Sequence, residues 1–110
     1  MLKDIPGYDG LYAINEYGRV WGYKKHRSPA GWRKTTTSWQ GYERIQLRKD
    51  GRYKYHSIHR LVAIIHLPNV YELPEINHKD GDKLNNAVEN LQILTRSEHK
   101  KIHHKLRKIK

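Results

Sequence analysis

Histidine and asparagine residues recur through the segment from Glu75 to His104, and their spacing constrains the fold more than any other feature. The residues in question are Asn77, His78, Asn90, His99 and His103. The short apolar run at Glu75-Ile76 predicts a strand that ends with Asn77 and His78 at its rim. Residues 79–86 are dense in Asp, Asn and Gly, which favour turns. Leu91–Leu94 then predicts a second strand.

A helix is predicted to begin directly after this second strand. Thr95 and Glu98 have the spacing of a capping box, with Thr95 as N-cap and Glu98 at the third helical position. His99 and His103 are four residues apart, so they project from one helical face as neighbouring metal ligands can. His104 points about 100° away and is not expected to join them.

Any metal in this chain has to be bound by nitrogen and oxygen atoms, because the chain has no cysteine. Asp80, Asp82 and Asn85 give residues 79–86 some likeness to a calcium loop. The EF-hand pattern nevertheless fails, since no Gly or closing Glu stands at the required offset. Calcium is therefore a weak alternative.

The charge of the chain selects its class of partner. Lys and Arg outnumber Asp and Glu by 22 to 11, for a formal net charge of +11. Such a field attracts polyanions, and cationic side chains release counterions from a phosphate backbone. The N-terminus has no apolar leader, and the longest apolar run, Leu61–Ile65, is too short for a bilayer. We therefore expect an intracellular protein without membrane contact.

The length of 110 residues predicts one domain of the α+β class, residues 1–110. We expect residues 1–56 to form a β-rich, DNA-contacting part of small antiparallel hairpins, and residues 57–110 a core helix followed by the site. The first hairpin is predicted within Leu11–Tyr23, with its turn at Asn15–Gly18.

Residues 24–39 are basic and polar, and they predict a loop with a short strand near Thr35–Trp39. One alternative is a solvated loop. The other is an arm that contacts phosphates, with Trp32 or Trp39 stacking against bases. For Trp39 we favour a structural role over stacking against bases.

A second hairpin is predicted from Tyr42–Arg48 and Arg52–Ile58, with two possible loops. An Asp50-Gly51 loop would place Leu47 opposite Lys54 and Ile45 opposite His56. A three-residue loop from Lys49 to Gly51 pairs Leu47 with Tyr53 and Ile45 with Tyr55, and we favour it because it separates apolar from charged residues. The favoured loop places these basic residues together on one face: Arg44, Arg48, Arg52, Lys54 and His56.

Ser57 is predicted to cap a core helix over Ile58–Leu67, which ends before Pro68. Leu61, Val62, Ile64 and Ile65 supply its apolar side. For His59 and His66, packing or hydrogen bonding is the favoured interpretation.

Three strings resemble parts of phage-type HNH endonucleases. I-P-G-Y-D-G-L-Y-A-I-N-E-Y-G-R-V-W resembles a short module found ahead of such nucleases. H-R-L-V-A, from His59 to Ala63, resembles the segment before the active site. N-H-K-D-G-D-K-L-N-N-A-V-E-N-L, from Asn77 to Leu91, resembles the core HNH motif. The resemblance implies a ββα-metal finger that hydrolyses phosphodiester bonds, leaving a 5′ phosphate and a 3′ hydroxyl.

The resemblance also implies a role for each site residue. His78 corresponds to the general base, and Asn90 to the asparagine that fixes the loop and orients the base. Asn77 and His99 correspond to metal ligands, and His103 to an additional ligand on the helix. The implied cofactor is one divalent metal ion, for which nitrogen and oxygen ligands favour Mn, Ni, Co or Zn, with Mg possible.

These residues predict a metal-dependent DNA endonuclease, either a nickase or a double-strand cutter, in a bacterial host of a phage or mobile element. Basic residues expected to contact double-stranded DNA are Arg44, Arg48, Arg52, Lys54, Lys79, Arg96 and Lys100. Because the sequence ends soon after the finger, we expect salt-sensitive binding with limited base readout. The alternative is a basic nucleic-acid-binding or regulatory protein that does not catalyse.

Overall fold

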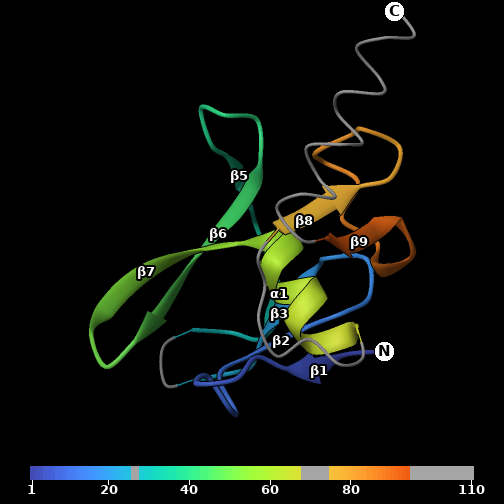
Figure 1. Cartoon of the computed structure of the whole chain (residues 1–110). Helices are drawn as coiled ribbons and strands as arrows, with labels where there is room; N and C mark the ends of the chain where they lie inside the picture. The colour runs from blue at the N-terminus through green and yellow to red at the C-terminus, as the bar shows by residue number, and fades with distance from the viewer. Residues whose placement is uncertain (26–27, 68–74, 95–110) are drawn as a thin grey trace, which may run out of the picture.

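Three antiparallel sheets surround one helix in the structure, a computed structural model that describes residues 1–25, 28–67 and 75–94 (Figure 1). The strand orders are β1-β2-β3-β4, β5-β6-β7 and β8-β9. The predicted α+β class, with antiparallel hairpins and a core helix, is confirmed. The helix predicted from Thr95 lies outside the described residues.

The first sheet contains the predicted N-terminal hairpin as β2 (Tyr12–Ile14) and β3 (Val20–Gly22). It is flanked by β1 (Lys3–Asp4) and β4 (Gly31–Arg33). The sequence prediction missed β4, because it has only three residues, begins with Gly31 and closely follows Pro29. Its pairing places Trp32 opposite Trp21 on β3, and the two rings meet edge to face at 5.1 Å between centroids.

The turn of this hairpin is built by Asn15 and Gly18 as predicted. The Asn15 side-chain oxygen accepts hydrogen bonds from the backbone N–H groups of Tyr17 and Arg19. Gly18 has φ of +87°, and a Cβ added there would lie 2.8 Å from Cγ2 of Ile58. Only glycine therefore allows the turn to approach the core helix this closely.

The second sheet consists of β5 (Thr36–Thr37), β6 (Glu43–Lys49) and β7 (Arg52–Ser57). The hairpin was predicted, but the favoured register was wrong. Leu47 pairs with Lys54 and Ile45 with His56, around a two-residue Asp50-Gly51 loop. The basic residues are consequently divided between the two faces of the hairpin, since residues directly opposite each other share a face.

The physical reason lies in the loop and in the position of the hairpin. Asp50 and Gly51 both have positive φ, 52° and 75°, which suits a two-residue turn between twisted strands. The hairpin projects away from the helix as an arm (Figure 1), so its distal end has no core to cover apolar side chains. Tyr53 and Tyr55 are therefore 59% and 50% exposed, not buried as predicted.

Residues near the turn between β5 and β6 give a second correction. The short strand predicted near Thr35–Trp39 exists as β5, but Trp39 is 92% exposed and is not part of the core. The turn that contains Trp39 is closed by a hydrogen bond from the Gly41 N–H to the Ser38 carbonyl oxygen. A structural role for Trp39 finds no support in this environment.

The helix α1 (Ile58–His66) lies at the centre of the described fold. It begins after Ser57 as predicted and ends at His66, one residue before the predicted end, and the Ser57 side chain makes no capping hydrogen bond. Packing or hydrogen bonding was expected of His66, and its Nε2 is hydrogen-bonded to the Ile14 carbonyl oxygen at 3.0 Å. None of the helices in the described part of the chain is long and apolar enough to cross a bilayer.

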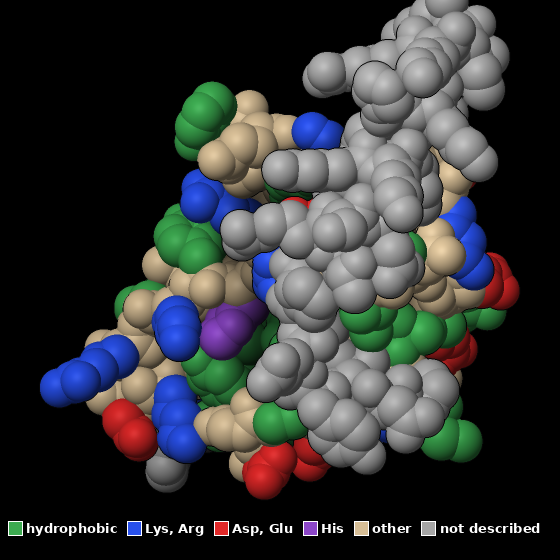
Figure 2. All heavy atoms as spheres, in the orientation of Figure 1, with side chains coloured by type: hydrophobic (Ala, Val, Ile, Leu, Met, Phe, Trp, Pro, Cys, Tyr) green, Lys and Arg blue, Asp and Glu red, His purple; other side chains and the backbone are tan. Residues whose placement is uncertain are grey.

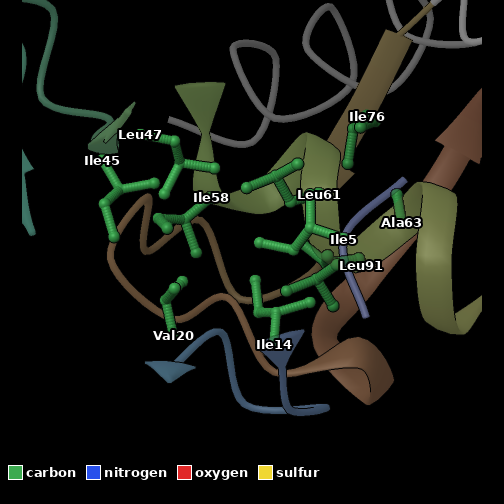
Figure 3. Packing of buried hydrophobic residues seen from close by; sticks show 11 residues of the cluster. Ile5, Ile14, Val20, Ile45, Leu47, Ile58, Leu61, Ala63, Ile76 and Leu91 are labelled. Atoms are coloured by element: carbon green, nitrogen blue, oxygen red, sulfur yellow. The ribbon is translucent and has the colours of Figure 1, made fainter. Parts of the chain in front are cut away.

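The core packs both flanking regions onto this helix (Figure 3). Its members come from all three sheets, from α1 and from the segment before β2; they are Ile5, Ile14, Val20, Ile45, Leu47, Ile58, Leu61, Val62, Ala63, Ile76 and Leu91. The N-terminal sheet and the HNH-like segment are thus held by one hydrophobic cluster, which fixes one relative to the other.

Candidate active site

The two strands predicted around the site are present as β8 (Glu75–His78) and β9 (Leu91–Leu94). Asn77 pairs with Gln92 and His78 with Leu91, so both site residues lie within the strand and not beyond its end. Successive strand residues face opposite ways. Ile76 and His78 are accordingly buried, whereas Asn77 is half-buried on the other face.

Asn90 ties together the loop between these strands. Its side-chain nitrogen donates to Asp80 Oδ1 at 3.0 Å and to the Asn85 carbonyl oxygen at 2.8 Å. Its side-chain oxygen accepts from the Asp80 N–H at 3.1 Å. The loop contacts expected of Asn90 are therefore present, and its catalytic role remains a prediction.

Asp80 is the other centre of this loop. Its carboxylate accepts hydrogen bonds from the Asn85 side chain and the Asp82 N–H, both at 2.8 Å, in addition to Asn90. These bonds, that from Asn85 first, lower the pKa of the Asp80 carboxyl. The acidic residues of this segment thus brace the loop by accepting hydrogen bonds from donors within it.

His78 is 7% exposed, and its ring is hydrogen-bonded to the side chain of Asn86. Nε2 of His78 and Oδ1 of Asn86 are 2.8 Å apart. Asn86, itself 2% exposed, donates from Nδ2 to Oε1 of Glu43 on β6 at 3.1 Å. The base predicted from the sequence is thereby connected to a carboxylate of the N-terminal region.

Two aromatic side chains form a wall beside His78. The ring of His59 lies 5.2 Å from that of His78 between centroids, and the ring of Tyr42 lies 6.1 Å away. His59 is 8% exposed, and its Nδ1 atom has no hydrogen-bond partner among the described residues. Burial, together with the charges of His78 and Arg60, lowers the pKa of His59 to about 4.

Of the three predicted metal ligands, only Asn77 falls within the described residues. His99 and His103 lie outside them, and residues 1–25, 28–67 and 75–94 contain no group of three His, Cys, Asp or Glu able to hold a metal. A set of one amide oxygen and two imidazole nitrogens fits a divalent transition metal. The residues present are therefore compatible with the predicted ion.

Four of the predicted DNA-contacting residues lie on the projecting arm formed by β6 and β7. Arg44 and Arg48 cover the rings of Tyr55 and Tyr53, with 4.1 and 5.5 Å to the centroids, on one face of the arm. Arg52 and Lys54 are exposed on the other face. Lys and Arg side chains are visible along this arm in Figure 2. Lys79 is exposed beside His78, and Arg96 and Lys100 lie outside the described residues.

Asn86, Glu43 and His59 were not identified as site residues from the sequence. Glu43 is 43 positions from Asn86, and no local pattern indicates that the two meet. For His59 the signal was its place in H-R-L-V-A, directly before the HNH-like segment, but the favoured interpretation was packing.

Comparison with models of known protein families identifies the domain to which these residues belong. Residues 56–101 match the HNH endonuclease family model, and residues 3–59 match the NUMOD4 motif. The chain therefore contains an HNH endonuclease domain. It carries the NUMOD4 motif ahead of the HNH domain, and the resemblance seen in the sequence is confirmed.

Individual relatives of this chain come from phages. The chain is 39% identical over 98 residues to the DNA endonuclease I-HmuI of Bacillus phage SP01, an alignment that covers 84% of this chain and 51% of that protein. It is 30% identical over 103 residues to the H-N-H endonuclease F-TflI of Escherichia phage T5, covering 91% and 48%. The chain thus spans about half the length of these curated relatives.

A solved structure is also similar. It describes DNA binding and cleavage by the HNH homing endonuclease I-HmuI, and it matches with a TM-score of 0.82 and 36% identity. The match covers 96% of this chain and 58% of that one. HNH endonucleases are in general dependent on a divalent metal.

Proposed function

We propose that this HNH protein is a metal-dependent endonuclease that hydrolyses phosphodiester bonds in double-stranded DNA. The observation that carries the proposal is the buried His78, held by Asn86 at the rim of a loop that Asn90 and Asp80 lock. A histidine fixed by one nitrogen can use the other to take a proton from water. The names of the relatives support DNA as the substrate.

In the proposed mechanism His78 is the general base. Neutral imidazole near pH 7 accepts a proton from the water that attacks the scissile phosphorus. The Asn90 contacts keep the loop, and with it the rim of β8, in one conformation during this step. Burial of His59 in its neutral form avoids placing a second positive charge against the His78 ring.

We propose Asn77, His99 and His103 as the residues that hold the metal ion. A divalent ion bound there would supply positive charge to the scissile phosphate and to the leaving 3′ oxygen. Mg, Mn, Ni, Co and Zn are all candidates, because an amide oxygen with two imidazoles discriminates weakly among them.

The proposed DNA surface begins at an open groove beside the active site. The groove has a volume of about 510 Å³, and its lining includes Tyr42, Arg44, His59 and Arg60. Nε of Arg44 is buried without a hydrogen-bond partner among the described residues. The two arginines, of which Arg60 is exposed, bring positive charge to this groove, which suits a phosphate of the backbone.

The arm of β6 and β7 would extend this surface along the duplex. Arg48 and Arg44 lie over the rings of Tyr53 and Tyr55. Because these contacts already restrict the two arginines, less side-chain conformational entropy is lost when they bind DNA. We propose that residues 1–56 and 57–110 act as one unit on DNA. The phage and prophage sources of the relatives support action in the cytoplasm of a bacterial host.

Relaxation of supercoiled plasmid tests the proposed function. The protein is incubated with Mg, Mn or Ni, with and without chelator, and conversion to open-circular or linear DNA distinguishes nicking from double-strand cutting. We expect cleavage that chelator abolishes and that His78→Ala lowers by at least about a hundredfold. Binding without cleavage under every metal would instead identify a non-catalytic DNA-binding protein.

A further inference from the structure

A chain of three side-chain hydrogen bonds runs from His78 to the N-terminal region. Nε2 of His78 lies 2.8 Å from Oδ1 of Asn86, and Nδ2 of Asn86 donates to Oε1 of Glu43 at 3.1 Å. The other carboxylate oxygen of Glu43 accepts from Oγ1 of Thr35 at 3.0 Å. These hydrogen bonds join β8 to β6, and no local pattern in the sequence predicts them.

Glu43 determines which way the Asn86 amide faces. An ionised carboxylate only accepts hydrogen bonds, so the amide nitrogen has to lie toward Glu43. The reverse orientation would set the amide oxygen against the carboxylate oxygen and lose the bond at a buried site. The amide oxygen of Asn86 therefore faces His78.

The orientation of the amide in turn determines where His78 carries its proton. An amide oxygen only accepts, so Nε2 of His78 has to be the protonated nitrogen of the neutral ring. The lone pair then resides on Nδ1. When the ring gains a proton on Nδ1, the Glu43 carboxylate also stabilises the resulting imidazolium through the polarised amide.

We propose that Glu43, acting through Asn86, is a positioning residue that holds His78 in the tautomer with its lone pair on Nδ1. This inference rests on the proposed function, in which His78 is the base, and adds to it the residues that fix the ring. Glu43 belongs to the segment that matches the NUMOD4 motif, and Asn86 to the HNH domain. The N-terminal motif would thus contribute to the chemistry of the HNH domain as well as to its packing.

Nitrogen NMR tests the tautomer without any cleavage. Full-length protein with ¹⁵N-labelled histidine is recorded free of metal, in alkaline buffer where imidazoles are neutral. The His78 signals are those missing from His78→Ala. We expect the Nε2-protonated pattern in the wild type, and a mixture of tautomers in Glu43→Gln, because an amide at position 43 accepts either orientation of Asn86.

Exchanging the two groups provides the rescue. In the double variant Glu43→Gln, Asn86→Asp, the new carboxylate accepts from Nε2 of His78, and the new amide donates to that carboxylate. The Nε2-protonated tautomer should return. Asp9→Asn, which removes one charge from an exposed residue, should leave the spectrum unchanged.

Single-turnover cleavage provides the second readout. Glu43→Gln should cleave about tenfold to a hundredfold more slowly, with DNA affinity within about threefold, and the double variant should regain at least about tenfold. An Nδ1-protonated wild-type ring, or a Glu43→Gln variant with one tautomer and unchanged rate, overturns the proposal. A wild type that shows the expected tautomer but never cleaves would refute the proposed function and leave the positioning by Glu43 standing.

Discussion

The rings of His59 and His78 pack against each other with their centroids 5.2 Å apart, and the burial of His59 beside His78 makes the stability of the fold depend on pH. The pKa of His59 falls from 6.5 to about 4 in the folded protein, because burial disfavours its charged form. Between these values the unfolded chain binds more protons than the folded one. Stability therefore rises with pH across the window from about 4 to 6.5.

The first prediction concerns this window. Urea unfolding at pH 7.5 and at pH 5 should show a decrease in the free energy of unfolding on acidification, of which His59 contributes up to about 2 kcal/mol. His59→Phe keeps a ring against His78 but does not titrate, so its decrease between the two pH values should be smaller by that amount. An equal decrease in both proteins would show that His59 is not the group responsible.

The second prediction concerns the close approach of Gly18 to the core helix. Gly18→Ala places a methyl group 2.8 Å from Cγ2 of Ile58 and 3.2 Å from Cβ of Asn86. Gly7→Ala is a matched control, because φ is +82° at Gly7 and +87° at Gly18, and nothing lies within 4 Å of a Cβ at Gly7. Both should be destabilised by about 1 kcal/mol through backbone strain, and Gly18→Ala by about 1–3 kcal/mol more.

Thermal or urea unfolding measures this difference directly. If the two alanine variants unfold alike, the contact between the N-terminal turn and α1 does not contribute to stability. If Gly18→Ala is the less stable, its cleavage rate also becomes informative, because Asn86 is one of the two neighbours that would have to move.

Local patterns in the sequence were sufficient for much of the site. The strands β8 and β9, the loop contacts of Asn90 and the turn at Asn15–Gly18 each depend on residues close together in the chain. Turn formers and alternating apolar residues act over such distances, so their pattern predicts the structure.

The two kinds of failure have different causes. When the register of a hairpin slips by one residue, every side chain of the shifted strand moves to the other face. The register that separates apolar from charged side chains was the wrong choice, because the projecting arm buries only Ile45 and Leu47. The contact of Glu43 with Asn86 joins positions 43 residues apart, and it depends on how the sheets pack around α1. Only the tertiary structure brings these two together.

The third prediction separates the shape of Asn90 from its hydrogen bonds. Asn90→Asp keeps the size of the side chain but replaces the donor nitrogen with an oxygen, 3.0 Å from Oδ1 of Asp80. Two carboxylates would then face each other, and the Asn85 carbonyl oxygen would be left without this donor. We expect a decrease of about 2–4 kcal/mol in the free energy of unfolding.

Urea unfolding near neutral pH checks this value against Gln46→Glu, which adds the same charge at an exposed position of β6. The control should change stability by less than about 0.5 kcal/mol. A similar small change in Asn90→Asp would mean that the loop does not depend on the Asn90 donors.

The fourth prediction concerns the arm as a phosphate-binding surface. Arg48 is exposed on β6 and covers the ring of Tyr53, so its charge is available to DNA. Removing one cationic side chain that binds a phosphate should lower the slope of log affinity against log salt by about 0.9. Arg48→Gln should therefore bind DNA more weakly at low salt and show a slope reduced by roughly one.

Lys3→Gln removes the same charge from β1, at the edge of the other sheet, and serves as the control. Fluorescence anisotropy of a labelled duplex in chelator, over a range of salt concentrations, gives both slopes without cleavage. If the arm binds phosphates, only Arg48→Gln should change the slope of log affinity against log salt. A cationic side chain that neutralises a phosphate releases counterions from the DNA, whereas a charge far from the DNA does not. Equal slopes for the two variants would show that Arg48 acts through the net charge of the protein and that the arm binds no phosphate there.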